Sequence, residues 1–264
     1  MNTSTRPLAL VTGASGGIGE ELARELAAKG YDLVLVARST GKLQGLADEL
    51  STGHGLTAHV LTADLGHAGA GHALASELAA KGLVIDVLVN NAGFADFGEM
   101  WNADAPKLDS MIALNMAVLT ELMHDLIPPM VSRGRGRVLN VASTAAFFPG
   151  PLMGVYYATK AYVLSLSEAT HEELKGTGVT VTALCPGPTQ SGFQAAAAME
   201  NSKLVKGRKM PTAKHVAESG VAAMLKGKPV AVIGAKNKLS VMSPRFLPRS
   251  LVPGMVKRAQ AASH

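Results

Sequence analysis

The segment from residue 8 to residue 26 constrains the fold of this chain more than any other part of the sequence. Leu8 to Val11 form a short apolar run typical of a buried strand, and a glycine-rich stretch from Thr12 to Gly19 follows at once. Apolar residues then recur at the spacing of an amphipathic helix, at Ile18, Leu22 and Leu26. Glycine lets the backbone approach a pyrophosphate, and the amides at a helix start attract its negative charge. The segment therefore predicts a dinucleotide-binding turn, with a purely structural turn as the alternative.

Strand-like and helix-like segments alternate along the rest of the chain, which predicts an α/β fold. At 264 residues the chain is long for one domain, but α/β folds reach this size as a single unit with a large core. We expect further strands near residues 31–36, 56–61, 85–89, 137–143, 179–184 and 229–233, and helices near 42–50, 71–81, 106–131 and 155–175.

Charge and cysteine content narrow the function classes. Residues 201–264 hold 13 Lys and Arg against one acid, Glu218, for a charge of +12, while the preceding residues hold 12 against 19, for −7. This basic segment holds a single aromatic residue, Phe246, and no recognised nucleic-acid module, so we expect no nucleic acid partner; a solvated face, an anionic substrate and a peripheral membrane contact stay open. The single cysteine, Cys185, cannot form an internal disulfide and reads as a core residue, which favours a reducing, cytoplasmic compartment.

The N-terminus is polar through Arg6, and glycines break the apolar run that follows it. We therefore expect neither a signal peptide nor a membrane-spanning helix of about 20 residues.

The end of the second expected strand, 31–36, predicts which nicotinamide dinucleotide is bound. Ala37 to Thr40 supply no carboxylate for a ribose 2′-hydroxyl, because Asp32 lies at the other end of the strand. Arg38, with the hydroxyls of Ser39 and Thr40, could instead bind a 2′-phosphate. This favours NADP(H) over NAD(H), with a solvated Arg38 as the alternative.

Polar side chains also follow the next two expected strands. Asp64, which Leu65 follows in the chain, could accept a hydrogen bond from an adenine amino group or could cap a helix. Asn91 could bridge neighbouring backbone segments, while Ala92 and Gly93 leave room for a ribose.

Tyr156 and Lys160 are the strongest candidates for catalysis. On a helix they lie one turn apart on one face, and an ammonium beside a phenol lowers the phenol's pKa. Tyr157 could also approach Lys160 and is ambiguous from spacing alone. Ser143 ends an expected strand, at the sheet edge where α/β folds bind ligands, and could hold a carbonyl against the tyrosine. Asn115, polar among apolar neighbours, could be no more than a satisfied core amide.

In combination these motifs resemble the classical short-chain dehydrogenase/reductase family. Thr12-Gly13-x-x-x-Gly17-x-Gly19, Asn90-Asn91-Ala92-Gly93, Asn115, Ser143, Tyr156-x-x-x-Lys160 and Pro186-Gly187 occur in the family's order and at close to its spacing over residues 7 to 234. The family's four-residue spacing selects Tyr156 as the catalytic tyrosine and leaves Tyr157 as packing.

The resemblance implies a doubly wound Rossmann fold with a seven-stranded parallel sheet and helices on both faces. It also implies reversible hydride transfer between a nicotinamide and a carbonyl or alcohol, a water held by Asn115, and a homodimer or homotetramer. Ser15 departs from the basic residue that some NADP-dependent members carry. We expect the catalytic residues to be Asn115, Ser143, Tyr156 and Lys160, with no metal. We expect the cofactor site to comprise Gly13, Ser15, Gly16, Gly17, Ile18, Gly19, Arg38, Ser39, Asp64, Leu65, Asn91, Ala92, Gly93, Tyr156, Lys160, Pro186, Gly187 and Thr189.

The expected organisation is a flexible N-terminus (1–6), a Rossmann domain (7–234) with a mobile substrate loop (about 189–215), and a basic C-terminal extension (235–264). Aromatic and proline residues could line an apolar pocket: Phe94, Phe97, Phe147, Phe148, Pro149 and Phe193. We therefore expect an NADPH-dependent oxidoreductase acting on a lipophilic carbonyl or alcohol. The alternatives are a 3-ketoacyl thioester or steroid-like ketone reductase and, in another class, a nucleotide-sensing Rossmann protein without turnover.

Overall fold

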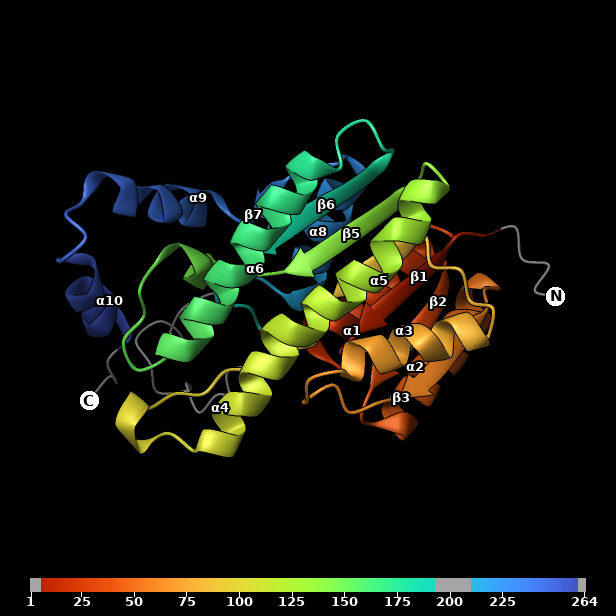
Figure 1. Ribbon diagram of the computed structural model, residues 1–264, viewed down its shortest axis with the longest axis horizontal. Coiled ribbons are helices and arrows are strands. Elements are labelled where there is room, and N and C mark those ends of the chain that lie inside the picture. The colour runs from red at the N-terminus through yellow and green to blue at the C-terminus, as the bar shows by residue number, and fades with distance from the viewer. Residues whose placement is uncertain (1–5, 193–209, 261–264) are drawn as a thin grey trace.

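A seven-stranded parallel sheet in the order β3-β2-β1-β4-β5-β6-β7 forms the centre of the molecule (Figure 1). The computed structural model describes residues 6–192 and 210–260. The strands are β1 (Leu8–Thr12), β2 (Asp32–Ala37), β3 (Ala58–Thr62), β4 (Val87–Asn90), β5 (Gly136–Val141), β6 (Val179–Cys185) and β7 (Val230–Val232). The strand order reverses between β1 and β4, so the carboxyl ends of these two strands flank a crevice. The predicted doubly wound Rossmann fold is confirmed.

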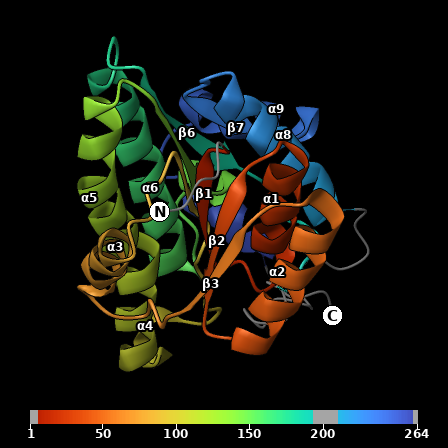
Figure 2. The same cartoon turned by 90° about the vertical axis from the view of Figure 1, so that its right-hand side faces the viewer.

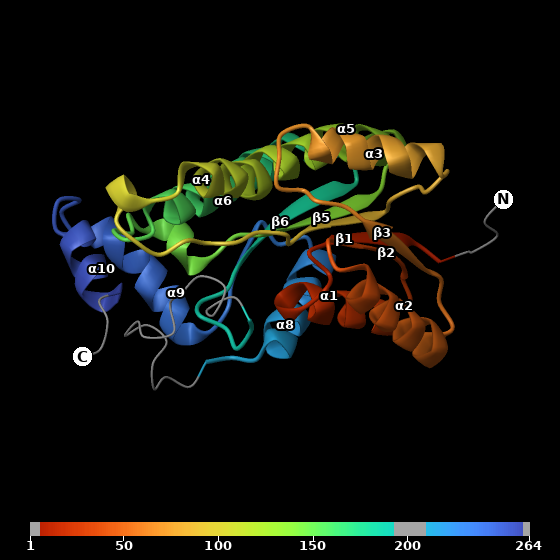
Figure 3. The ribbon, with the colours of Figure 1, turned by 90° about the horizontal axis from the view of Figure 1, so that it is seen from below.

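Helices cover both faces of the sheet, which explains why the strands are almost continuously apolar (Figures 2 and 3). On one face α1 (Gly17–Ala28), α2 (Thr40–His54) and α8 (Ala213–Leu225) enclose one apolar core. On the other face α3 (Ala70–Ala80), α5 (Val118–Ser132) and α6 (Gly154–Glu173) enclose a second. Each strand side chain therefore has a helix to pack against, whichever face it points to.

The helix predicted over 106–131 is three elements in one continuous run. It begins as α4 (Ala105–Ile112), widens into a π-helix at η2 (Ala113–Ala117), and continues as α5. The segment Ala105–Ser132 is long and apolar enough to span a membrane by length and composition, and about a third of its most apolar window is buried. Core helices of globular proteins can pass the same test of length and composition, so the expectation of no membrane-spanning helix stays a prediction. In this structure α5 packs its apolar face, including Leu122 and Met130, into the core against α3 and β5.

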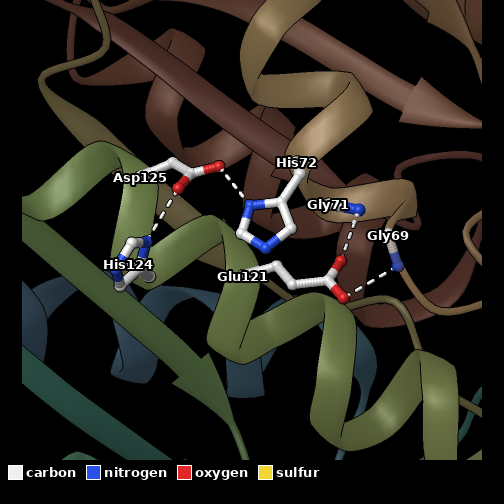
Figure 4. A network of polar contacts seen from close by, with 6 residues as sticks. All are labelled: Gly69, Gly71, His72, Glu121, His124 and Asp125. Carbon is white, nitrogen blue, oxygen red and sulfur yellow. Dashed lines mark hydrogen bonds and ion pairs between the residues drawn. The ribbon is translucent and has the colours of Figure 1, made fainter.

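A polar network fastens α3 to α5 (Figure 4). The Glu121 carboxylate accepts hydrogen bonds from the backbone N–H groups of Gly69 and Gly71, at 2.8 and 2.9 Å, and so caps the start of α3. One turn further along α5, Asp125 accepts from His72 at 2.6 Å and from His124 at 2.9 Å. These contacts therefore hold together two helices that are not consecutive in the chain, since β4 and α4 lie between α3 and α5.

The basic extension folds into helices rather than trailing away from the sheet. It comprises α9 (Ala235–Met242), η4 (Ser243–Phe246) and α10 (Val252–Gln260), beyond the carboxyl ends of the strands (Figure 1). Gln260 is fully buried and its Nε2 donates a hydrogen bond to the Tyr157 hydroxyl. The packing role predicted for Tyr157 therefore includes a polar contact with the last described helix.

Two further segments bear on the expected boundaries. Short 3₁₀ turns, η1 (Met100–Asn102) and η3 (Thr144–Phe147), precede α4 and α6 respectively.

At the N-terminus, Arg6 donates hydrogen bonds to the carbonyls of His54 and Gly55, so this residue of the predicted flexible segment is anchored to the end of α2. Most of the predicted substrate loop, residues 193–209 including Phe193, lies outside the described residues.

Candidate active site

The four residues predicted to be catalytic come from three separate segments and meet at the carboxyl edge of the sheet. Tyr156 and Lys160 lie in the first turns of α6, Ser143 follows β5, and Asn115 lies in the π-helical segment η2. A Cβ built at Gly93, after β4, would lie 2.8 Å from Asn115 Oδ1 and 3.6 Å from Lys160 Nζ. The loop after β4, η2 and α6 therefore converge on one point.

Tyr156 is buried and hydrogen-bonded to Ser143. Burial raises the pKa of the phenol above its usual value of 10.0, and the hydrogen bond with the Ser143 side chain lowers it to a smaller extent. Ser143 is itself held in place, because its Oγ accepts a hydrogen bond from Ala145 N at 3.1 Å as η3 begins. The phenol is therefore a protonated donor beside a positioned hydroxyl.

Lys160 approaches the face of the Tyr156 ring, and its Nζ lies 5.8 Å from the ring centroid. The ammonium donates a hydrogen bond to the Val141 carbonyl at 2.8 Å. Burial lowers the pKa of Lys160 to about 8. The sequence suggested that Lys160 lowers the pKa of Tyr156; in this geometry the lowering contribution comes from Ser143, because the ammonium is directed to the end of β5.

Asn115 has a structural function that the sequence left open. Its Nδ2 donates to the Phe94 carbonyl at 3.0 Å and to Thr159 Oγ1 at 3.1 Å, and its Oδ1 accepts from Phe94 N at 3.2 Å. The side chain therefore matches the satisfied-amide alternative and ties the loop after β4 to α6. Sequence reasoning missed the π-helix around Asn115, a local widening of the helix that occurs frequently at functional sites. No residue type in Ala113–Ala117 signals it.

The glycine turn between β1 and α1 is built around Asn91. Its Nδ2 donates to the carbonyls of Thr12 and Gly13 at 2.9 and 3.2 Å, which confirms the predicted bridge between backbone segments. Gly13 has φ +67, and a Cβ there would lie 2.8 Å from Asn91 Nδ2. Only glycine therefore fits between the turn and the loop after β4. Ser15, Gly16, Gly17 and Ile18 continue this turn into α1, and Gly19 packs under it.

Arg38 lies at the carboxyl end of β2 with an exposed side chain, and Ser39 precedes the first turn of α2. Asp32 begins β2 and accepts a hydrogen bond from Thr57 N, so it lies at the amino end of the strand, opposite Arg38, as predicted. The Thr40 hydroxyl bonds that of Thr62 at 2.8 Å. The site therefore presents one cation and the hydroxyl of Ser39, but no carboxylate, at the strand end.

Asp64 does not cap a helix, contrary to one of the two predicted roles. Its Oδ1 accepts from Gly66 N at 2.9 Å and shapes a bend, while α3 begins only at Ala70. Leu65 is buried in the core, so its side chain faces away from the crevice.

The turn after β6 contacts α9. A Cβ on Gly187 would lie 2.6 Å from Asn237 Nδ2, so glycine is needed here for the approach of α9, and its place in the cofactor site stays a prediction. Asn237 Nδ2 also donates to the Ile233 carbonyl at 2.7 Å. Beside it, Thr189 Oγ1 donates to the Gly187 carbonyl at 2.9 Å and follows Pro186 in a rigid turn. The C-terminal extension therefore supports the loop that carries the predicted cofactor residues Pro186, Gly187 and Thr189.

Together these elements fit a nicotinamide dinucleotide. The glycine turn and the start of α1 suit a pyrophosphate, Arg38 suits an adenosine phosphate, and the space over Gly93 lies beside Lys160 and Asn115. Among residues 6–192 and 210–260, no three His, Cys, Asp or Glu side chains gather as metal ligands would.

Apolar side chains surround Tyr156. Phe94, Phe97 and Phe148 pack with Tyr156 and Tyr157 in a cluster that includes Val256 of α10. On the Tyr157 side, Phe147, Phe148 and Pro149 line a groove of about 700 Å³ whose other wall is the C-terminal extension, including Val241, Arg245 and Arg249. The sequence predicted the aromatic lining residues. It did not predict that residues 235–260 form the other wall of the groove and pack against the cluster.

The family model for short chain dehydrogenase matches residues 7–202. This chain belongs to the short-chain dehydrogenase family. It is 35% identical over 182 residues to a very-long-chain 3-oxoacyl-CoA reductase from Bos taurus, covering 67% of this chain and 58% of that protein. This dehydrogenase-family chain therefore spans a little over half the length of that curated relative.

Solved structures of this family extend the likeness to nearly the whole chain. A short-chain dehydrogenase from Sphingobium yanoikuyae in complex with NADPH is 30% identical with a TM-score of 0.81, covering 97% of this chain and 99% of the other. A bulky-bulky ketone specific alcohol dehydrogenase from Comamonas testosteroni is 26% identical with a TM-score of 0.78, covering 99% and 98%.

Proposed function

We propose that this short-chain dehydrogenase is an NADPH-dependent oxidoreductase that interconverts a carbonyl and an alcohol. The observation that carries the proposal is a buried tyrosine, Tyr156, bonded to the Ser143 hydroxyl and lying one helical turn from Lys160. A non-catalytic nucleotide sensor has no use for a buried phenol and a buried ammonium held at the mouth of a dinucleotide crevice, since burying both is costly.

The chain's own residues would bind and orient the dinucleotide. Arg38 would pair with a 2′-phosphate, the amides of the glycine turn would hold the pyrophosphate, and Lys160 would bind the nicotinamide ribose. When bound, NADPH supplies the hydride that reduces the carbonyl carbon. The preference for NADP(H) over NAD(H) rests on Arg38 and on the NADPH complex of the Sphingobium relative.

The proton chemistry belongs to Tyr156. Because burial raises its pKa, the phenol is protonated at neutral pH and can donate to the oxygen of the forming alcohol. Ser143 holds the carbonyl oxygen against the phenol by a hydrogen bond. Lys160, whose pKa burial lowers to about 8, can return a proton to the phenolate near neutral pH, and Asn115 fixes the loop and helix on which this relay depends.

The substrate that the site supports best is lipophilic, with 3-oxoacyl thioesters and bulky ketones as the candidate classes. The apolar cluster around Tyr156 favours such a substrate. The bovine relative's name specifies a very-long-chain 3-oxoacyl-CoA, and the Comamonas structure is specific for bulky-bulky ketones.

NADPH oxidation against ketones, aldehydes and 3-ketoacyl thioesters tests this function. We expect Tyr156→Phe to lower kcat by about 10²–10⁴-fold, the range of general acid catalysis. Tyr162→Phe is the matched control, because Tyr162 lies on the same helix and its hydroxyl bonds Thr120 Oγ1 at 2.8 Å, away from Ser143. Undiminished turnover by Tyr156→Phe would contradict the role of Tyr156. Tight NADPH binding without turnover of any substrate would favour the sensor.

The assembly state and the compartment are proposed on separate grounds. We propose a homodimer or homotetramer, as the family commonly forms, and a reducing compartment, because Cys185 is buried and unbridged. Sedimentation velocity tests the first proposal, and a chain that remains a monomer at micromolar concentration would exclude it.

A further inference from the structure

The C-terminal extension, residues 235–260, exposes more large apolar side chains than any comparable segment of the described chain. Leu239, Met242, Phe246, Leu251 and Met255 are each 50% to 80% exposed. Apolar side chains of this size on one short segment mark an interaction surface, because water otherwise disfavours them.

The same segment is purely cationic. It holds six basic residues and no acid: Lys236, Lys238, Arg245, Arg249, Lys257 and Arg258. All six are exposed, and none forms an ion pair with any residue in the described parts of the chain. Their charge is therefore available to an external anion.

Helical spacing places apolar and basic residues together on the outward surface. On α10, Val252, Val256 and Gln260 are four residues apart and face the protein. Leu251, just before α10, with Met255 and Arg258 on it, follows at spacings of four and three residues along a neighbouring row, and all three are exposed.

On α9, Val241 is buried, whereas Lys238 and Met242 lie one turn apart on the exposed face. Both helices therefore anchor one side to the protein and present an apolar-basic side to solvent.

The position of this surface connects it to the candidate active site. The extension leaves the sheet at the carboxyl end of β7 and returns to Tyr157 through Gln260 (Figures 1 and 3). Arg245 and Arg249 line the groove beside Phe147 and Phe148. A ligand bound by the extension would thus lie next to the apolar surroundings of Tyr156.

We infer that residues 235–260 dock this protein on an anionic lipid bilayer, with the apolar side chains at the acyl boundary and the cations among the lipid phosphates. Short amphipathic helices that combine exposed apolar residues with Lys and Arg bind at this depth of a membrane. A second copy pairing through the same surface would bring six cations against six, so charge favours the lipid. The docking would present the site to lipophilic substrates, a benefit that rests on the proposed function; the docking itself does not.

Vesicle pelleting tests the inference without any measurement of turnover, so it can fail independently of the proposed activity. We expect the full-length protein to pellet with phosphatidylglycerol vesicles, to pellet at least about tenfold less with phosphatidylcholine vesicles, and to be released by 0.5 M salt, at a Debye length of roughly 4 Å. Absence of pelleting with phosphatidylglycerol would overturn the inference.

Two double variants and one control separate charge from apolar contact. Arg245→Glu with Arg249→Glu should weaken binding to phosphatidylglycerol vesicles by about tenfold or more. Leu239→Ser with Phe246→Ser should weaken it severalfold at unchanged charge; both side chains are exposed, so the fold, checked by Tm, should persist. Lys226→Glu with Lys228→Glu, an equal charge change between α8 and β7 at the other edge of the sheet, is the matched control.

Equal losses in the control and in the Arg245/Arg249 variant would show attraction by net charge alone and would overturn a docking surface. Sedimentation velocity adds the last comparison. If the Leu239/Phe246 variant changes the oligomeric state while vesicle binding stays intact, the surface binds another copy and not lipid.

Discussion

Burial disfavours the charged form of Lys160, so the stability of the fold should depend on pH. Its pKa is about 8 in the folded chain against 10.5 for the exposed group. Below pH 8 both states are protonated, and the folded state bears the cost of the buried ammonium, about 3 kcal/mol by linkage. Between pH 8 and pH 10.5 the folded state loses its proton first, so stability rises with pH.

Lys160→Met should therefore stabilise the fold while removing the proposed activity. The variant loses the hydrogen bond to Val141, which offsets about 1 kcal/mol of this stabilisation. The free energy of unfolding should therefore increase by about 1–2 kcal/mol at pH 7. The gain should shrink as pH rises from 8 towards 10.5. Urea unfolding of both proteins at pH 7 and pH 9.5 measures it, and a pH-independent difference would show that Lys160 is not desolvated.

Arg38 is the residue on which the proposed preference for NADPH over NADH depends. Arg38→Ala should weaken NADPH binding by about 10–100-fold, the loss of a charge-assisted hydrogen-bond partner, and leave NADH binding nearly unchanged. Fluorescence titration with both nucleotides measures the effect. Arg135→Ala is the control, because Arg135 precedes β5 at the opposite edge of the sheet and contacts Asp86. Equal losses for NADPH and NADH would remove Arg38 from the phosphate site.

At the scale of elements, α10 depends on a buried hydrogen bond to α6. Gln260 is fully buried, and its amide bonds the Tyr157 hydroxyl. Gln260→Leu should leave that hydroxyl without this donor and weaken the docking of α10 by about 1–3 kcal/mol.

Hydrogen exchange of residues 252–260 measures this docking. In a double-mutant cycle with Tyr157→Phe, we expect a coupling energy of about 0.5–3 kcal/mol. Ala259→Ser, a change at an exposed neighbour, is the control. A coupling near zero would mean that the Gln260–Tyr157 hydrogen bond does not contribute to the docking of α10.

The contact between α3 and α5 should be sensitive to pH. The hydrogen bond with Asp125 raises the pKa of His72 above 6.5. Burial alone would raise the pKa of Asp125, but hydrogen bonds from His124 and His72 outweigh it and hold that pKa below 3.8. The histidine contribution is complete below pH 6.5 and is lost as pH rises through its folded pKa, while the carboxylate contribution is lost at low pH.

Asp125→Asn should accordingly lower Tm most between about pH 4 and pH 6.5, and less at pH 8.5 (Figure 4). Thermal unfolding across this range measures the difference. Asp109→Asn, a change at another acidic residue of the same helical run, is the control. A Tm difference that grows with pH would contradict a charged His72.

At the scale of the whole molecule, the sheet order explains why residues so distant in the chain share one site. Parallel strands end at the same edge, so the segments after β1, β2, β4, β5 and β6 all open towards one crevice. The extension adds a sixth segment, because β7 ends at that edge too and the chain that follows turns back over Tyr157.

The sequence by itself determined the elements and the chemistry. Periodicity located every strand to within about two residues, because strands buried on both faces must be continuously apolar. The four-residue spacing placed Tyr156 and Lys160 on one helix face, since helix geometry depends only on separation along the chain, and the family resemblance selected Tyr156 over Tyr157 as the predicted catalytic tyrosine.

Only the tertiary structure decided what depends on contacts between distant segments. The partners of Lys160, Gly187 and Tyr157 lie on other elements, at Val141, Asn237 and Gln260, and no local spacing encodes them. The π-helix at Asn115 and the return of residues 235–260 to the site arise in the same way. Packing fixes them, and packing is a property of the folded chain as a whole.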